Sequence, residues 1–282
     1  MNDPSEHPVL TDGEAQSHVA NSPPSETNAS IPFALEARDV SKHFGGVAAL
    51  SSANFALANG EVHAIVGDNG AGKSTLLKII AGAHRPDSGD ILINGEKVLI
   101  PNPRAAQNLG VTTVFQDLGL VDDLDAAANL FLGRELYHRP PLSWLGVLNN
   151  KAMRAIAKQH ISRLNVSISS IDQLLGTMSG GQRQAIAVCR AIAFGTRVII
   201  MDEPTAALGV RETAAVLDVI RRLHDNGLAV AMVSHSLSDV FAVAQRLTIL
   251  RNGRTIRTTN VCDVTLEEIV RLMTAGVANA PS

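Results

Sequence analysis

Gly67-Asp68-Asn69-Gly70-Ala71-Gly72-Lys73-Ser74 matches the pattern G-x-x-x-x-G-K-[ST], and this stretch decides the fold of the chain. Residues 61–66 before it have the composition of a strand, and the apolar spacing after it predicts a helix. In such a context the glycines let backbone N–H groups fold around phosphates at a helix N-terminus. Lys73 is expected to contact the β- and γ-phosphates, and Ser74 to ligate Mg²⁺. The strand–loop–helix context favours a nucleoside triphosphate site over a ligand-free glycine-rich turn.

A second apolar run, residues 198–201, ends in two acids, Asp202 and Glu203. Four apolar residues in succession suit a parallel strand that is covered on both faces. Adjacent side chains at a strand end point in different directions, so Asp202 is predicted to hold Mg²⁺ while Glu203 faces the attacking water as general base. Without further context, these two acids would be interpreted as solvent-exposed residues at the end of a strand. Their position downstream of a phosphate loop favours the catalytic interpretation.

Short apolar strands alternate with amphipathic helices along the rest of the chain. We predict strands at residues 111–115 and 228–233, a helix over 211–224, and a hairpin over 91–99. Residues from about 117 to 195 have almost no strand pattern and are predicted to form a helical insertion. The pattern predicts an α/β protein with a mainly parallel sheet. The phosphate loop resembles that of the P-loop NTPases, and this resemblance implies a RecA-like parallel sheet core, with an antiparallel β subdomain and an inserted α-helical subdomain.

The two ends of the chain differ in composition from the middle. Residues 1–30 are rich in Pro, Ser and Asn and contain no Lys or Arg, and they are predicted to form a disordered extension. Residues 275–282 are predicted to be a flexible tail. The domain is expected to span residues 31–274.

Composition excludes several classes of function. The chain has 282 residues, a net charge of −3 and no run near the ~18 apolar residues of a membrane span. This charge disfavours a nucleic-acid partner. Two cysteines, Cys189 and Cys262, are too few for a disulfide framework or a Cys-rich metal site. With no apolar leader, these features lead us to expect a cytoplasmic location.

Ser179-Gly180-Gly181-Gln182 precedes a predicted helix at about 185–194. Ser179 and Gln182 have capping-box spacing, which any helix can show. The two glycines, however, would let a phosphate approach the backbone at a positively polarised helix end. Here the sequence resembles the ATP-binding cassette (ABC) ATPases, whose signature is L-S-G-G-Q. Met178 stands in the place of the leading Leu.

The resemblance covers about residues 34–273, and further motifs occur in family order. It implies that Gln116 senses Mg²⁺ and links to a membrane partner, that His235 contacts the γ-phosphate and braces the base, and that Phe44 stacks on adenine. The nucleotide-binding residues so implied are Phe44, Gly67, Asp68, Asn69, Gly70, Ala71, Gly72, Lys73, Ser74, Thr75, Ser179, Gly180, Gly181 and Gln182. The implied catalytic residues are Glu203, His235 and Gln116, and the implied metal ligands are Ser74, Gln116 and Asp202, with ATP and Mg²⁺ as cofactors.

One position departs from the family pattern. An Asp usually follows the Ala-Leu pair after the catalytic Glu, and this chain has Gly209 there. The usual Asp helps to couple two ATP sites across a dimer. We therefore expect looser coupling in this chain.

Within the family, residues 75–82, 203–210 and 129–135 are similar to those of monosaccharide importers of the ribose, xylose and fructose type. One phosphate loop and no internal repeat place the chain in the single-cassette branch. The resemblance implies a homodimer at the cytoplasmic face of the inner membrane, bound to permease subunits around residues 116–132 and served indirectly by a periplasmic sugar-binding protein. The alternatives are an importer of another solute such as amino acids, a soluble ABC ATPase, and a non-hydrolysing ATP binder.

Overall fold

The computed structural model describes residues 33–115, 117–140, 142–164, 166 and 168–274. Gln116, the predicted extension at 1–30 and the predicted tail at 275–282 lie outside the described residues. All elements below belong to the unit Pro32–Ser282. Among the described residues, no helix combines the length and the apolar character that a bilayer span requires.

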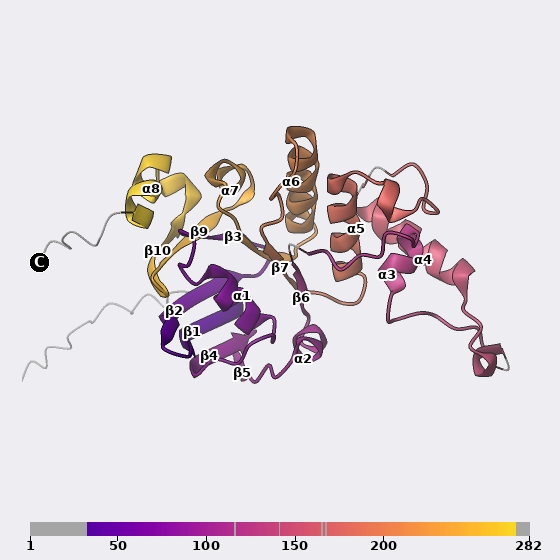
Figure 1. Ribbon diagram of the computed structural model, residues 1–282, viewed down its shortest axis with the longest axis horizontal. Helices are drawn as coiled ribbons and strands as arrows, with labels where there is room; N and C mark the ends of the chain where they lie inside the picture. Colours follow the sequence, from indigo (N-terminus) through magenta and orange to yellow (C-terminus); the bar gives the residue numbers. More distant parts are fainter. Residues whose placement is uncertain (1–32, 116, 141, 165, 167, 275–282) are drawn as a thin grey trace, which may run out of the picture. The chain divides into compact units, whose positions relative to one another are not determined.

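A six-stranded sheet, ordered β10-β9-β3-β8-β7-β6, positions the predicted phosphate loop (Figure 1). Five of its strands run parallel, and β10 pairs antiparallel with β9 at one edge. The strands are β3 (Val62–Val66), β6 (Val111–Val114), β7 (Val198–Asp202), β8 (Ala229–Val233), β9 (Arg246–Arg251) and β10 (Arg254–Asn260). The predicted strands at 61–66, 111–115, 198–201 and 228–233 are therefore confirmed, with ends one residue different.

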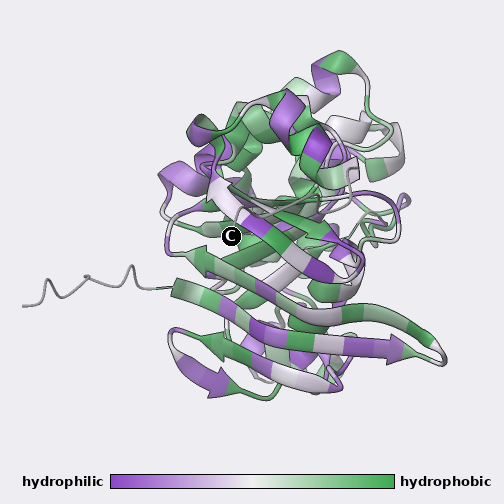
Figure 2. Ribbon diagram, turned by 90° about the vertical axis from the view of Figure 1, so that its left-hand side faces the viewer, coloured by the Kyte–Doolittle hydropathy of each residue, from purple (hydrophilic) through white to green (hydrophobic). Residues whose placement is uncertain are grey.

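The predicted antiparallel subdomain is a second, four-stranded sheet in the order β2-β1-β4-β5. Its strands are β1 (Phe33–Phe44), β2 (Val47–Ala58), β4 (Ser88–Ile93) and β5 (Glu96–Val98). The β4–β5 hairpin turns at Asn94 (φ 52°) and Gly95 (φ 82°), the two positive φ angles that a type I′ turn requires. Figure 2 shows both hydrophilic and hydrophobic residues along the long strands, without a strict alternation.

The insertion between β6 and β7 is helical, as predicted. Its helices are α3 (Ala126–Phe131), α4 (Asn150–Arg163) and α5 (Gly180–Ile192), with 3-10 turns at Leu142–Leu145 and Leu175–Thr177. The start predicted for the last helix, about residue 185, is wrong: α5 begins at Gly180, directly after its cap Ser179. The capping bonds of Ser179 satisfy the first turn and so outweigh the low helix propensity of Gly180 and Gly181.

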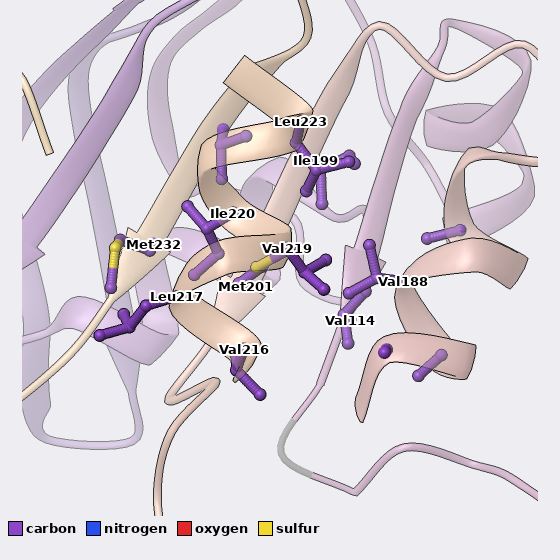
Figure 3. Close-up of a cluster of buried hydrophobic side chains, with 14 of the residues drawn as sticks. Val114, Val188, Ile199, Met201, Val216, Leu217, Val219, Ile220, Leu223 and Met232 are labelled. Carbon is purple, nitrogen blue, oxygen red and sulfur yellow. The ribbon is translucent and has the colours of Figure 1, made fainter. Parts of the chain in front are cut away.

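Both faces of the parallel sheet are covered. In β3, Ala64 packs into one hydrophobic cluster and Ile65 into the other, and both are fully buried. The first cluster faces α5 and α6, and the second faces α1 and the antiparallel sheet. Figure 3 shows Val216 and Ile220 of α6 and Ile199 of β7 among the side chains of the first cluster. The helices outside the insertion are α1 (Lys73–Ile80), α2 (Pro103–Asn108), α6 (Val210–Asp225), α7 (Leu237–Val243) and α8 (Leu266–Thr274).

Candidate functional site

The glycine-rich loop connects β3 to α1, which begins at Lys73. Gly67 (φ +155°) and Gly72 (φ +102°) both hold conformations that L side chains rarely adopt. A Cβ on Gly67 would collide with the carbonyl oxygen of Leu250, and one on Gly72 would lie 2.7 Å from that of Ala49. The loop therefore needs glycine at both positions to fit between β9 and the antiparallel sheet.

The ammonium of Lys73 lies inside this loop. Its Nζ donates to the carbonyl oxygens of Gly67 at 2.7 Å and Asp68 at 3.0 Å. Burial lowers the pKa of Lys73, and the nearby carboxylates of Glu203, Asp68 and Asp202 oppose that shift. A buried cation enclosed by backbone at a helix N-terminus is suited to bind phosphate oxygens.

Ser74 and Asp202 join the phosphate loop to the end of β7. The Ser74 hydroxyl donates to Oδ1 of Asp202 at 3.4 Å. Burial raises the pKa of Asp202, and the charge of Glu203 adds to the rise. A hydroxyl and a carboxylate are the oxygen ligands that Mg²⁺ accepts, together with phosphates. Among the described residues, no three His, Cys, Asp or Glu side chains gather as a metal site.

Glu203 and His235 form a second pair beside the loop. Oε2 of Glu203 lies 2.7 Å from Nδ1 of His235, which follows β8, and the His235 N–H points to the same oxygen at 3.4 Å. The Glu203 N–H donates to the carbonyl of Val233 at 3.0 Å. Glu203 has φ 52°, a left-handed conformation that is costly for a residue with a side chain. The surrounding contacts hold the carboxylate in place despite this strain.

The signature segment forms the N-terminus of α5. Its capping box is complete: Gln182 N–H donates to Ser179 Oγ at 3.3 Å, and Ser179 N–H donates to Gln182 Oε1 at 3.1 Å. The Gly180 N–H donates to Oε1 of Glu212 at 3.0 Å. A Cβ on Gly180 would lie 2.7 Å from Cδ2 of Leu208, just ahead of α6, so the Leu208 side chain would have to shift to make room for it.

Glu212 is a residue that the sequence analysis missed. Its second oxygen, Oε2, accepts from the Gly209 N–H at 3.2 Å, so one carboxylate bridges the N-termini of α5 and α6. The spacing of Gly209 and Glu212, three residues apart before an apolar helix, is a capping signal that would have placed Glu212 at the start of α6. Its partner Gly180 is remote in sequence, and no local pattern indicates that contact.

Of the remaining predicted residues, the structure describes Phe44 and Thr75 but not Gln116. Phe44 ends β1 with 45 % of its surface exposed, and its ring contacts His84 edge-to-face at 5.2 Å between centroids. An exposed ring at a strand end is available for stacking. Gln116 lies outside the described residues, and Thr75 is in the first turn of α1. The structure thus gathers the phosphate loop, Asp202, Glu203 and His235 at the carboxyl ends of β3, β7 and β8.

A groove of about 820 Å³ lies along the predicted partner-binding segment. Arg190 of α5 shapes its wall by donating to the carbonyls of Leu118 at 2.6 Å and Gly119 at 2.7 Å. Arg134 stacks over Phe194 at 4.5 Å, at the other side of the groove. Both guanidinium groups are therefore held in place by contacts within the chain.

The comparisons with known proteins agree with this geometry. The family model described as "ABC transporter" matches residues 50–206. The fructose import ATP-binding protein FrcA of Rhizobium meliloti is 44 % identical over 86 % of this chain and 94 % of its own length. The xylose/arabinose import ATP-binding protein XylG of Sulfolobus acidocaldarius is 43 % identical, with the same coverage. The ribose import ATP-binding protein RbsA of Bacillus subtilis is 41 % identical over 85 % of this chain, which spans only 47 % of RbsA.

Solved structures share the fold. The ADP conformation of MJ1267, an ATP-binding cassette of an ABC transporter, superposes with a TM-score of 0.72 at 24 % identity, over 86 % of this chain and 95 % of that one. A dimeric cassette, MJ0796 bound to ADP and Pi, has a TM-score of 0.65 at 23 % identity over 80 % of this chain and 98 % of that one. The predicted P-loop NTPase fold is confirmed. On its sequence and its fold, the chain belongs to the ABC transporter family, as one of its ATP-hydrolysing cassettes.

Proposed function

We propose that ATP hydrolysis by this chain drives the uptake of a monosaccharide through a separate membrane permease. The observation that carries the proposal is the identity of 41–44 % to relatives named for ribose, xylose/arabinose and fructose import. Two of those relatives are matched over 94 % of their length, so the likeness is not confined to the ATP site. In this proposal the chain lies at the cytoplasmic face of the inner membrane, and a periplasmic sugar-binding protein delivers the sugar to the permease.

Glu203 is the general base of the proposed reaction. Its carboxylate follows β7 directly, beside Asp202, and accepts a proton from the water that attacks the γ-phosphate. His235 orients this carboxylate through the contact of 2.7 Å between Nδ1 and Oε2. Held by its backbone and its side chain together, Glu203 needs little reorganisation before it acts.

Lys73, Ser74 and Asp202 bind the triphosphate and its metal in this proposal. Lys73 and the loop N–H groups contact the phosphates. Ser74 and Asp202, with Gln116 as the third predicted ligand, would hold Mg²⁺, which neutralises charge on the phosphates. Phe44, at the end of β1, stacks on the adenine.

The signature of one subunit completes the ATP site of another in this proposal. Ser179 to Gln182 lie on α5 of the helical insertion, whereas the phosphate loop lies between β3 and α1. We infer a head-to-tail homodimer with two equivalent sites, formed when ATP binds. The dimeric cassette among the structures of the same fold supports this assembly.

The permease contacts the groove along residues 117–134. Fixed guanidinium groups of Arg190 and Arg134 give it a shaped, polar wall. Cysteine cross-linking from Leu120 to a cytoplasmic loop of the permease tests this placement. Cross-links confined to other faces of the chain would contradict it.

The cargo is tested by uptake. Cells that lack this chain are complemented with the wild type or with Glu203→Gln, and uptake of labelled ribose, xylose, fructose and leucine is compared. We expect one monosaccharide to enter only in cells with the wild type. Restored uptake of leucine and of no sugar would favour the amino-acid alternative.

A further inference from the structure

The helical insertion carries an arm, described at residues 137–140 and 142–148, that takes no part in the proposed ATPase chemistry. The arm is closed at its base, where His138 N–H donates to the carbonyl of Val147 at 3.0 Å. Asn149 N–H likewise donates to the carbonyl of Leu136 at 2.6 Å. In Figure 1 the chain between α3 and α4 runs out beyond both helices, away from the two sheets. The arm therefore presents its tip to the surroundings.

The tip of the arm is apolar and exposed. Trp144 and Leu145 are adjacent, and 81 % and 80 % of their surfaces are exposed. Tyr137 at the base is 53 % exposed. Isolated apolar residues are ordinary on a protein surface, but a neighbouring Trp–Leu pair at the end of a protrusion indicates a contact site. Tryptophan in particular favours the boundary between water and lipid headgroups.

The chain around this tip is cationic and lacks acids. Residues 136–171 contain five Lys or Arg and no Asp or Glu, in a chain whose net charge is −3. Arg154 is engaged by Asp125 and Asp172. The other four basic residues of this segment are Arg139, Lys151, Lys158 and Arg163. None of them forms an ion pair with a residue that the structure describes. Positive charge therefore remains uncompensated on the arm and along α4.

We propose that the arm inserts Trp144 and Leu145 into the headgroup region of an anionic phospholipid leaflet. An exposed aromatic and aliphatic tip beside unpaired cations complements a negatively charged lipid surface. A second copy of this chain would bring the same positive charge to the contact, and repulsion disfavours that occupant. The arm thus gives the cassette a membrane attachment of its own, in addition to the permease of the proposed function.

The chain contains its own probe for this contact, because Trp144 is its only tryptophan. The full-length protein is mixed with vesicles of phosphatidylcholine and phosphatidylglycerol, or with vesicles of phosphatidylcholine alone, and Trp144 emission is recorded. We expect a blue shift with the anionic vesicles, quenching by brominated acyl chains, and reversal at high ionic strength.

Variants separate the two contributions to binding, measured by co-sedimentation. Leu145→Ser is expected to weaken binding about ten-fold, since it removes most of an apolar side chain from the lipid. Arg139→Gln with Lys151→Gln is expected to weaken it about 25-fold, at roughly five-fold per charge. Leu99→Ser and Arg254→Gln are the matched controls, because they change an exposed leucine just after β5 and an exposed arginine of β10. We expect both controls to bind like the wild type.

ATP turnover of each variant shows that it is folded and keeps this test separate from the proposed transport function. An unshifted Trp144 emission with anionic vesicles, in a protein with normal turnover, would overturn the proposal alone. Equal binding to neutral and anionic vesicles would overturn it too. A blue shift of Trp144 emission that occurs only with vesicles containing the permease would also overturn the proposal, because it would show that the arm contacts the permease and not the lipid.

Discussion

At Glu203 the end of β8 holds both the backbone and the side chain. The N–H is bound to Val233 at the end of β8, and the carboxylate is bound to His235 beyond it. Asp202, one residue earlier, reaches Ser74 instead. The positive φ of Glu203 turns the chain between these two carboxylates, so that each contacts a different group. One strand end can thereby serve both the metal and the water.

Glu203→Gln is expected to keep ATP binding and to slow hydrolysis by about 10²–10⁴-fold. The amide preserves the shape of the side chain but cannot accept the proton of the water. Binding is measured with a fluorescent ATP analogue, and turnover by phosphate release. Glu96→Gln, an exposed change on β5, is the control. Turnover close to that of the wild type would refute the role given to Glu203.

His63 lies in β3 with none of its surface exposed. Its Nε2 is 2.8 Å from the hydroxyl of Thr248, and its Nδ1 is 3.5 Å from Glu61. Burial lowers the pKa of His63, against the opposing effect of Glu61, while Arg246 adds to the lowering. The folded chain therefore holds this imidazole neutral under conditions in which the unfolded chain protonates it.

Acid should destabilise the fold through His63. Above a pH of about 6.5 the group is neutral in both states and contributes no slope. As the pH falls below that value, only the unfolded state binds the proton, so the free energy of unfolding decreases by up to about 1.4 kcal/mol per pH unit. Urea unfolding at several pH values measures this slope. We expect His63→Gln to reduce it and His138→Gln, at an exposed position, to leave it unchanged.

At the scale of elements, α5 and α6 begin side by side and share one carboxylate. Glu212 of α6 accepts from Gly180 at the start of α5 and from Gly209 ahead of its own helix. Gly209, where the family usually has Asp, is thus attached to the signature helix of its own chain. The Glu212 carboxylate therefore connects the segment after Glu203 to the signature segment within one chain.

Glu212→Ala is expected to lower the free energy of unfolding by about 1–3 kcal/mol, because two N–H groups at helix N-termini lose a charged acceptor. Glu212→Gln should cost less, since the amide oxygen can still accept from one of them. Urea denaturation measures both, with Glu96→Ala as the exposed control. A loss of only a few tenths of a kcal/mol in Glu212→Ala would contradict the bridge.

The sequence predicted the elements whose patterns are local. A phosphate loop placed β3 and α1, apolar runs placed β7 and β8, and Asn94-Gly95 placed the hairpin turn. The start of α5 was misplaced because two glycines are unfavourable in a helix. The capping bonds of Ser179 outweigh that cost, and the glycines allow close packing against Leu208 and Glu212. The limits of β1 and β2 were not predicted, since their pairing has repeated register shifts that interrupt the alternation.

At the scale of the whole molecule, the 282-residue chain contains one phosphate loop and one signature segment. In the head-to-tail homodimer that we propose, both ATP sites are identical by symmetry. The tie from Gly209 to α5 through Glu212 lies within one chain, whereas the usual Asp at this position acts across the dimer. We therefore expect each site to turn over without waiting for the other.

Mixing two inactive variants tests this independence. Lys73→Ala disables the phosphate loop, and Ser179→Arg disables the signature. A mixed dimer has both defects in one site and none in the other, so we expect part of the ATPase activity to return on mixing. Mass spectrometry of the assembly verifies that mixed dimers form. Mixed dimers without recovered activity would mean that the two sites act together.

The left-handed backbone of Glu203 places thermal stability and ATPase activity in conflict. This residue carries a conformational cost of roughly 1 kcal/mol, and its charge also raises the pKa of its neighbour Asp202. Glycine would remove both the conformational cost and the negative charge beside Asp202. We therefore expect Glu203→Gly to have a melting temperature a few degrees above that of the wild type and to lose ATP turnover. A melting temperature at or below that of the wild type would refute this. In a laboratory evolution experiment that selects for heat resistance alone, we therefore expect Glu203, the proposed general base, to be among the first residues replaced.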